Sequence, residues 1–365
     1  MNENPSRSLP TASAFAAYEL AFAAGLVFFA PHALLRMLGT PSYRAGIGQR
    51  LSLQGGISEL PSRPVWIQAV SLGEVKSVTP LIRKINDDNC PVFLTTTTET
   101  GFRVARELHG AGNAVSYFPL DLTPVVKRVL TRVRPRAIVL FETEICGNMK
   151  FDAAPTPPSL DEIEKLRLDL ALEGDTPLIV AGSTHEGEDE AVLRAYADIL
   201  SKSPKARLLI APRHPERFDA VEELIKGAGF RVRRRSRPAR GAGAGGVILL
   251  DTVGELARVY AMASVSFVGG SLAKVGGHNI IEPASMGKPV LFGPHMHHFE
   301  DVKEAFLSDN AAICVRDHKE LSSAIARLIE NPSCAAELGE AAMRVVAANR
   351  GATDRYFEAL RKYLG

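Results

Sequence analysis

The chain has 365 residues, which is too long for one ordinary hydrophobic core and predicts two domains. Hydrophobic residues make up 46% and charged residues 23%, values that exclude an intrinsically disordered chain. The formal net charge is only +2, and no basic patch is interleaved with aromatic residues, so no nucleic-acid partner is expected. The four cysteines lie far apart without CxxC spacing, which argues against a disulfide framework or a cysteine zinc site.

The N-terminal segment carries the membrane signal. Residues 20–35 contain no Asp, Glu, Lys or Arg and are interrupted by Pro31 and His32. The run is shorter than the roughly 20 residues of a spanning helix, so it predicts a membrane-associated helix over residues 14–38, in the interface or as a short anchor. A cleaved signal peptide and a core helix are the alternatives. The following domain is expected on the cytoplasmic side because arginines follow, at positions 36, 44 and 50.

Residues 41–150 alternate short apolar runs with helix-like stretches, the pattern of βαβ units in a parallel sheet. They predict an N-terminal Rossmann-like domain. Residues 152–159 are rich in proline and end the pattern, so residues 151–176 are predicted to be a linker followed by a helix. The expected strands are residues 65–70, 92–96, 114–118 and 137–141, and the expected helices are residues 74–86, 100–109 and 123–133.

The alternation resumes over residues 177–348 and predicts a second domain, followed by a final helix over residues 349–365. The fold class is therefore α/β, with two doubly wound sheets facing a cleft. Ligands bind such sheets beyond the carboxyl ends of the strands, so functional residues are expected directly after strands. The expected strands are residues 178–182, 207–211, 231–233, 247–251, 265–269, 289–292 and 312–315.

Ser71 and Glu74 follow the first expected strand. A serine followed three residues later by a glutamate is a capping box at the start of a helix. A carboxylate in this position can also serve as a general base that deprotonates an acceptor hydroxyl. Both interpretations are compatible with the sequence.

Glu142 and Glu144 follow the fourth expected strand. Side chains two residues apart on an extended segment point in the same direction, so both carboxylates can face the cleft. Such a pair can divide acid and base roles, or its members can be solvated loop residues.

The second domain offers an anion site. Ser183 and Glu186 follow its first strand and form another capping-box pattern, and a helix start with free amides binds anions. Arg213 and His214 follow the second strand, where arginine is suited to bidentate phosphate contact. A surface ion pair is the alternative for these two residues.

Residues 269–287 are the densest segment, with glycines at a strand end that free the backbone for close approach. His278 and Asn279 then open a short helix that carries Glu282 in its first turn. Such a glutamate can accept hydrogen bonds from a ribose diol, while the helix start faces a phosphate. The combination indicates a nucleotide-sugar-binding domain. The histidines within residues 294–301 lack helical HxxxH spacing, so no metal site is expected there.

The chain resembles the 3-deoxy-D-manno-octulosonic acid (Kdo) transferases of lipopolysaccharide synthesis. The matching segments occur in family order through most of the chain. They are residues 66–74 (WIQAVSLGE), 95–101 (TTTTETG), 119–121 (PLD), 141–144 (FETE), 147–152 (GNMKFD), 183–188, 211–217 and 276–282.

The resemblance implies a GT-B fold with an acceptor-side N-terminal domain, a C-terminal CMP-sugar-binding domain and an N-terminal anchor. It implies an inverting transfer of Kdo from CMP-Kdo to the lipid A precursor, with no metal or other cofactor, at the cytoplasmic face of the bacterial inner membrane. Glu74 stands at the position of the family's base, although Gln68 replaces the usual histidine of that motif. The implied CMP contacts are Pro212, Arg213, Val253, Gly254, Glu255, Asn279, Ile280, Ile281 and Glu282.

The resemblance breaks at residues 145–146. In the family the Glu-Thr-Glu motif continues into Trp-Pro-Asn and a long further stretch, whereas here Glu144 is followed almost directly by the segment GNMKFD. About two βα units are missing, which predicts a shortened N-terminal domain. A catalytically inactive nucleotide-binding relative and a GT-B enzyme for another nucleotide sugar are therefore alternatives. The arginines of residues 231–240 indicate either a surface for anionic lipid or an ordinary edge strand.

Overall fold

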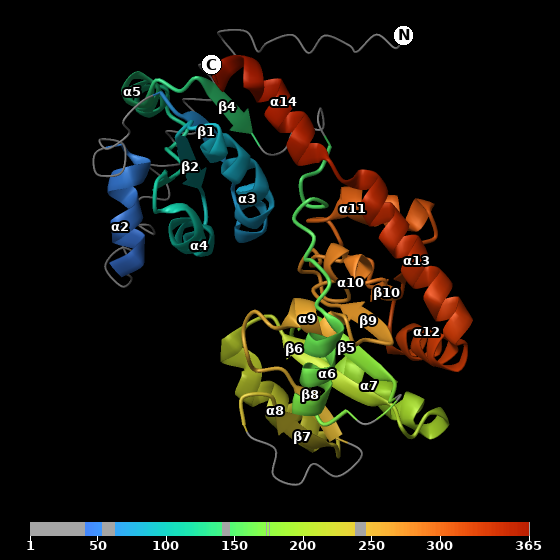
Figure 1. Ribbon diagram of the computed structural model, residues 1–365. Helices are drawn as coiled ribbons and strands as arrows, with labels where there is room; N and C mark the ends of the chain where they lie inside the picture. Colours follow the sequence, from blue (N-terminus) through green and yellow to red (C-terminus); the bar gives the residue numbers. More distant parts are fainter. Residues whose placement is uncertain are drawn as a thin grey trace. The chain divides into compact units, whose positions relative to one another are not determined.

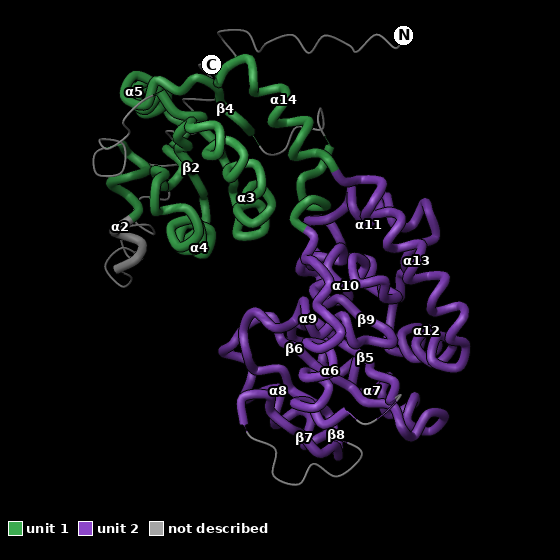
Figure 2. The backbone as a smooth tube through the Cα atoms, viewed as in Figure 1, with its two compact units in different colours: residues 1–153, 351–365 green, residues 154–350 purple. Residues whose placement is uncertain are grey.

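The computed structural model describes residues 41–52, 63–140, 147–172, 174, 176–237 and 246–364, the side chains of residues 41–45 excepted. The chain divides into two compact units (Figure 2). The first comprises residues 1–153 and 351–365, and the second comprises residues 154–350. The expected membrane helix over residues 14–38 lies outside the described residues. Within the described ranges, no helix combines the length and apolarity needed to cross a bilayer.

The first unit is built on a parallel sheet with the order β3-β2-β1-β4. Figure 1 labels its strands β1, β2 and β4. Buried β-branched and aromatic residues form the strands, and amphipathic helices connect them. Its elements are α2 (Pro41–Arg50), β1 (Val65–Gln68), α3 (Leu72–Asp87), β2 (Val92–Thr96), α4 (Glu99–His109), β3 (Ala114–Tyr117), α5 (Thr123–Val133), β4 (Ala137–Leu140) and α14 (Ala352–Leu364).

Helices cover both faces of this sheet. Residues of α3, α4 and α14 pack against one face. On the other face, Val129 and Val133 of α5 pack with Trp66 and Phe93. The Trp66 indole donates a hydrogen bond of 2.9 Å to the Thr95 hydroxyl, which satisfies the only buried polar atom of that side chain.

β4 is an edge strand of the described sheet and carries apolar side chains that are exposed to water. Ile138 and Leu140 are 48% and 51% exposed, although they lie beside Trp66 and Gln68 of β1 in the parallel register. Residues 141–146, which follow β4 and include the expected shortening, lie outside the described residues. Part of one sheet face is therefore left open by the described elements of this unit.

The final helix belongs to the first unit rather than standing apart. Tyr356, Leu360 and Leu364 of α14 are buried in the same cluster as α3. Asp152 holds the start of the helix, because its carboxylate accepts hydrogen bonds of 2.6 Å from the amides of Gly351 and Thr353. The sequence predicts the helix itself, but the residue that caps it, Asp152, lies about 200 residues earlier in the chain.

The second unit contains a seven-stranded parallel sheet with the order β11-β10-β9-β5-β6-β8-β7. The chain starts at the central strand β5, runs outward to β7 and returns to the other side of β5 with β9. The elements are α6 (Leu160–Asp169), β5 (Leu178–Thr184), α7 (Glu188–Lys202), β6 (Arg207–Pro212), η2 (Pro215–Arg217), α8 (Phe218–Gly227), β7 (Arg231–Arg234), β8 (Gly246–Leu249), α9 (Leu256–Tyr260), β9 (Val265–Val268), α10 (Ile281–Ser285), β10 (Val290–Phe292), α11 (Glu300–Ser308), β11 (Ile313–Cys314), α12 (His318–Glu330) and α13 (Pro332–Asn349).

Helices α7, α8 and α12 cover one face of this sheet, and their buried side chains form one core with alternate residues of the strands. Helix α9 covers the other face at β5. A Cβ atom on Gly182 would lie 2.0 Å from the Tyr260 hydroxyl oxygen, so only glycine fits there. Every strand expected in both halves is present, because short apolar runs that alternate with helical stretches are the main sequence signal of this fold.

The described part of the arginine-rich stretch begins with the edge strand β7, and several of its cations are paired within the unit. The Arg234 Nε atom lies 2.6 Å from Glu222, and Arg234 also pairs with Asp219. The Arg235 guanidinium lies 3.1 Å from the Glu255 carboxylate and 3.5 Å from that of Asp169. These contacts favour the edge-strand interpretation over a free basic surface.

Candidate functional site

The strand order of the second unit places a candidate site at the carboxyl ends of β5 and β9. These neighbouring strands continue into connections that run in opposite directions along the sheet. In a doubly wound sheet this switch point leaves a crevice between two diverging loops, where ligands bind. The loop after β5 carries His185, and the loop after β9 leads to His278. Arg213 and His214 follow β6, the other neighbour of β5.

Three imidazoles meet at this point. The His185 and His278 rings are stacked with centroids 5.0 Å apart, and their Nε2 atoms lie 2.8 Å from each other. His214 contacts the His185 ring edge-on at a centroid distance of 5.2 Å. At 2.8 Å one Nε2 donates and the other accepts, so His185 and His278 adopt complementary tautomers.

The site keeps the imidazoles of His185 and His278 neutral. Burial and the positive field of Arg213, His185, His214 and His298 lower the pKa of His278 to about 3. Burial also lowers the pKa of His185, against the opposing effect of Glu188. At neutral pH the two rings therefore offer hydrogen bonds rather than charge, and the arginine is the cation of the cluster.

The low pKa of His278 makes the stability of the second unit depend on pH. In the unfolded chain a histidine has a pKa near 6.5, whereas in the folded site the pKa of His278 is about 3. Acidification therefore favours the unfolded chain. We expect the low pKa of His278 to reduce the free energy of unfolding by about 2 kcal/mol between pH 7 and pH 4.5. Urea unfolding followed by circular dichroism should show a shallower pH dependence for His278→Gln. Equal slopes in variant and wild type would contradict the prediction.

The turn after β5 differs from the expected capping box. Ser183 has a positive φ of 56° and lies within β5, and α7 begins only at Glu188 after Gly187, whose φ is 86°. The expected Ser183–Glu186 pair is therefore wrong, because Gly187 adopts the left-handed conformation and delays the helix start. Glu186 is exposed, whereas Glu188 is 1% exposed.

Glu188 fills the turn that follows β9. One carboxylate oxygen accepts hydrogen bonds from the Gly270 amide at 2.6 Å and the His185 amide at 2.9 Å. The other oxygen accepts from three successive amides of the loop, those of Ser271 at 2.9 Å, Leu272 at 2.8 Å and Ala273 at 3.2 Å. The glycines after β9 thus let the backbone approach the internal Glu188 carboxylate, and the loop amides are already hydrogen-bonded to it.

Arg213 projects from the end of β6 and is exposed. Its backbone is held in place, because its amide donates a 3.0 Å hydrogen bond to the Thr184 carbonyl. Pro212, the last residue of β6, is buried. The guanidinium is thus available at the rim of the imidazole cluster.

An ion pair joins the first turn of α7 to η2. The Arg217 guanidinium lies 2.6 Å from the carboxylate of Asp189, whose side chain is fully buried, and it also donates to the Thr184 carbonyl at 3.2 Å. Burial raises the pKa of Asp189, against the lowering effects of Thr184 and Arg217. Arg217 thus compensates a charge that would otherwise be costly.

The segment with Asn279 and Glu282 lies at the start of α10. The Asn279 side chain accepts a 3.1 Å hydrogen bond from the Ile281 amide and lies 3.5 Å from the Glu282 carboxylate. Glu282 is half-buried, and it adds to the effect of burial in raising the pKa of Tyr260. The buried Ile280 and Ile281 anchor this short helix.

The turn after β8 holds the remaining expected contacts. Val253 is 83% exposed, and Gly254 has a φ of 91° that favours glycine. Burial acts to raise the pKa of Glu255, but hydrogen bonds from Thr252 and Arg235 prevail and lower it. The Glu255 carboxylate is therefore fixed by these hydrogen bonds, while the exposed Val253 side chain provides an apolar surface.

Glu74 belongs to the first unit. Ser71 caps α3, with its hydroxyl accepting from the Glu74 amide. The Glu74 carboxylate accepts a 2.7 Å hydrogen bond from the Val70 amide and a 3.0 Å bond from the Ser71 hydroxyl. The cap is confirmed, and the half-buried carboxylate is oriented at the carboxyl end of β1. Glu142 and Glu144 lie outside the described residues.

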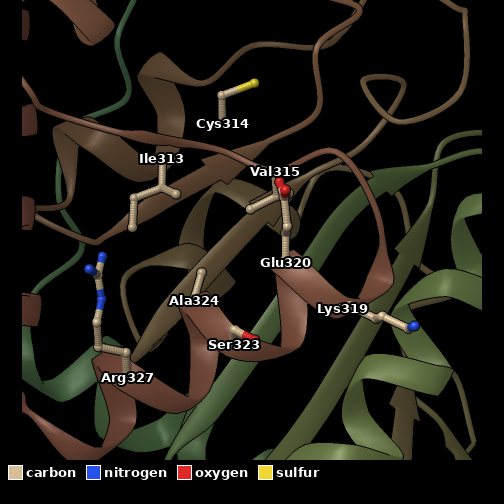
Figure 3. A pocket seen from close by; sticks show the side chains of 8 residues that line it. All are labelled: Ile313, Cys314, Val315, Lys319, Glu320, Ser323, Ala324 and Arg327. Atoms are coloured by element: carbon tan, nitrogen blue, oxygen red, sulfur yellow. The ribbon is translucent and has the colours of Figure 1, made fainter.

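A surface hollow is unrelated to these residues (Figure 3). It is lined by β11 and one side of α12, including Lys319, Glu320 and Arg327. None of the expected site residues contributes to it. Across the described ranges, no group of three histidine, cysteine, aspartate or glutamate side chains is arranged to hold a metal ion.

His185, Glu188, Asp189 and Arg217 are the site residues that the sequence patterns did not single out. The available signal was the acidic run after Gly187, since acidic residues are typical of a first helical turn. It indicates where α7 begins, but it does not show that two of its carboxylates point inward.

Comparison with known proteins agrees with this geometry. Residues 45–154 match the family model described as 3-Deoxy-D-manno-octulosonic-acid transferase (kdotransferase). The 3-deoxy-D-manno-octulosonic acid transferase of Haemophilus influenzae is 29% identical over 398 residues, covering 89% of this chain and 93% of the relative. That of Bordetella pertussis is 30% identical over 378 residues, covering 83% of this chain and 88% of the relative. The first alignment is longer than the chain itself, so segments of that relative have no counterpart here.

Solved structures show the same fold. A glycosyltransferase from Rickettsia africae has a TM-score of 0.56 at 11% identity and covers 83% of this chain and 98% of its own. A spinosyn rhamnosyltransferase has a TM-score of 0.53 at 11% identity and covers 82% and 99%. The two parallel-sheet units and these neighbours assign the GT-B fold, and the match to the transferase relatives makes the chain a glycosyltransferase. More specifically, the chain belongs to the 3-deoxy-D-manno-octulosonic acid transferase family.

Proposed function

We propose that this chain transfers Kdo from CMP-Kdo to the lipid A precursor, lipid IVA, in lipopolysaccharide biosynthesis. The transfer inverts the anomeric configuration and uses no metal or other cofactor. The observation that carries the proposal is the 30% identity to a Kdo transferase over 83% of this chain, which includes both units. The cluster of imidazoles beside Arg213, at the carboxyl ends of β5, β6 and β9, supports a nucleotide-linked donor.

The second unit binds the donor in this proposal. Arg213 faces the CMP phosphate and stabilises the negative charge that develops as CMP leaves. The neutral imidazoles of His185 and His278 add hydrogen bonds to the same group. Glu282, oriented by Asn279, accepts hydrogen bonds from the ribose hydroxyls. Pro212, Ile280, Ile281 and the turn Val253-Gly254-Glu255 complete the nucleotide contacts.

Glu74 is the proposed base. Its carboxylate is held by the Val70 amide and the Ser71 hydroxyl, which supports a fixed direction for proton abstraction. It would remove the proton from the acceptor hydroxyl as that oxygen attacks the anomeric carbon of Kdo. Ser183, His214, Glu142 and Glu144 remain further candidates for contacts around the two substrates.

The acceptor is a lipid, which requires access to a membrane surface. We propose that residues 14–38 associate with the cytoplasmic face of the bacterial inner membrane. Their apolar composition and the arginines that follow support this location. Deleting these residues should release the protein from vesicles of anionic phospholipid, while transfer to a detergent-dispersed acceptor continues.

The proposal is tested by incubating the purified chain with CMP-Kdo and lipid IVA and detecting the product by mass spectrometry. Added EDTA should leave the rate unchanged, and CMP should compete better than UDP. Proton NMR of the product reports its anomeric configuration. CMP binding without any product would instead establish a donor-binding relative that does not catalyse transfer, and preferential competition by UDP would point to another donor.

We expect Arg213→Ala to weaken donor binding by roughly 10- to 100-fold, because a charge-assisted contact to phosphate contributes about 1.5–3 kcal/mol. The KM for CMP-Kdo and the calorimetric Kd for CMP should both rise, while the KM for the acceptor stays within about twofold. Arg231→Ala is the matched control, because Arg231 is exposed at the start of the edge strand β7. Equal effects of the two substitutions would remove Arg213 from the donor site.

A further inference from the structure

Glu188 is a carboxylate that the proposed reaction does not use, although it lies at the centre of the candidate site. It is 1% exposed, and five backbone amides donate hydrogen bonds to it. Burying an ionised carboxylate is unfavourable unless hydrogen bonds replace its water. A glutamate in the first turn of a surface helix would remain in water at no such cost. The inward position therefore has to be explained by what the carboxylate holds.

The carboxylate holds the loop that leads to His278. Its bond to the Gly270 amide fixes one side of that residue, and the Gly270 carbonyl accepts the Gly277 amide at 2.7 Å on the other side. Gly277 directly precedes His278 in the chain. A short hydrogen-bonded path thus runs from the start of α7 through Gly270 to the imidazole at the donor site.

Steric contacts reinforce the same path. A Cβ atom on Gly269 would lie 2.8 Å from the Glu188 carboxylate. A Cβ atom on Gly270 would lie 2.8 Å from the His278 ring and 3.5 Å from the His185 ring. The absence of a side chain at Gly269 therefore lets the loop contact the Glu188 carboxylate. The absence of a side chain at Gly270 lets the two imidazoles pack against the loop.

The loop amides also cannot serve the donor. The amides of residues 270–273 point at Glu188, so the turn that would otherwise bind an anion is already filled by an internal one. Phosphate recognition then falls to side chains, above all Arg213 and the imidazoles. The direction of those imidazoles depends on a loop that Glu188 holds.

We propose that Glu188 is a positioning residue for donor binding: its buried carboxylate fills the anion-binding turn of residues 270–273 and thereby sets His278 in the orientation that CMP-Kdo requires. Glu188 does not touch the substrate in this proposal. The inference rests on the proposed function for its substrate, but the state of the loop can be measured without any substrate.

Glu188→Gln keeps the volume of the side chain but turns an NH₂ group toward backbone donors. We expect the KM for CMP-Kdo and the Kd for CMP to rise by about 10-fold or more, while the KM for the acceptor stays within about twofold. Hydrogen–deuterium exchange of a peptide covering residues 269–277 should accelerate without ligand, while the exchange of α3 in the first unit stays the same. Glu186→Gln is the matched control, since that exposed carboxylate lies two residues away.

Chemical rescue separates a positioning role from a general loss of stability. Glu188→Ala removes a group of the size and charge of acetate, so added acetate should restore CMP affinity and slow the loop exchange, whereas acetamide should do neither. If the alanine variant does not fold, Gly270→Ala disturbs the same path from the loop side, with the same expected split between donor and acceptor KM.

A folded Glu188→Gln protein with unchanged donor KM and unchanged loop exchange would overturn the inference. A wild-type chain that neither binds CMP nor transfers Kdo would sink the proposed function instead. In that case the exchange comparison and its rescue by acetate still decide whether Glu188 holds the loop.

Discussion

Glu74→Gln is expected to lower kcat by at least about 100-fold, and by as much as about 10⁴-fold, with little change in the Kd for CMP. A positioned general base contributes this range, and the amide cannot accept the acceptor proton. The substitution keeps one oxygen that can accept from the Val70 amide or the Ser71 hydroxyl, so the start of α3 should persist. Single-turnover kinetics with saturating CMP-Kdo and lipid IVA measure the effect.

Glu99→Gln is the matched control for this prediction. Glu99 is also a carboxylate in the first turn of a capped helix of the same unit, α4. It should leave kcat within about twofold of wild type. Transfer that survives in Glu74→Gln at a comparable rate would remove the base assignment, even if Kdo transfer itself is established.

Arg217→Ala is expected to lower the free energy of unfolding by about 3–5 kcal/mol at pH 7. The substitution leaves the fully buried carboxylate of Asp189 without its cation, which is the usual cause of losses of this size. It also removes a hydrogen bond to the Thr184 carbonyl at the end of β5. Urea unfolding followed by circular dichroism measures the loss, with Trp66 fluorescence as a separate report on the first unit.

The stability loss of Arg217→Ala should depend on pH in a defined direction. Without Arg217 the pKa of the buried Asp189 rises further, so the folded protein binds a proton more readily than the unfolded chain. A raised carboxyl pKa stabilises the folded state at low pH and loses that effect as the pH rises. The gap between variant and wild type should therefore widen from pH 4.5 to pH 8. Adding Asp189→Asn should recover part of the loss; no recovery would show that Asp189 is not the cause.

The sequence predicts the elements well because they depend on short-range effects. Apolar runs between amphipathic stretches identify the strands of both sheets except β7, which carries three arginines. β5 and β6 extend only one or two residues beyond their expected ends. The Ser71 cap was also predictable, since a serine three residues before a glutamate satisfies local amides. The same rule failed at Ser183, where a glycine with positive φ moved the helix start to Glu188.

The residues of the donor site could be found in part because they follow strands. Arg213 and His278 were expected from that position alone, and the tertiary structure adds that their loops meet at the switch point beside β5. The sequence did not indicate His185, because a single histidine after a strand matches no functional motif. Its role appears only when the stacked ring of His278, 93 residues later, lies 2.8 Å away.

What the sequence determined by itself is the class of fold, the family and the set of segments that carry the chemistry, because backbone propensities, apolar periodicity and motif order are local properties. Only the tertiary structure decided which groups meet. The Glu188 carboxylate and the Gly270 amide are 82 residues apart and become partners because the strand order makes β9 the neighbour of β5. No local rule predicts that partnership, since a first-turn glutamate is equally stable in water, and the burial that distinguishes it exists only once both strands lie in one sheet.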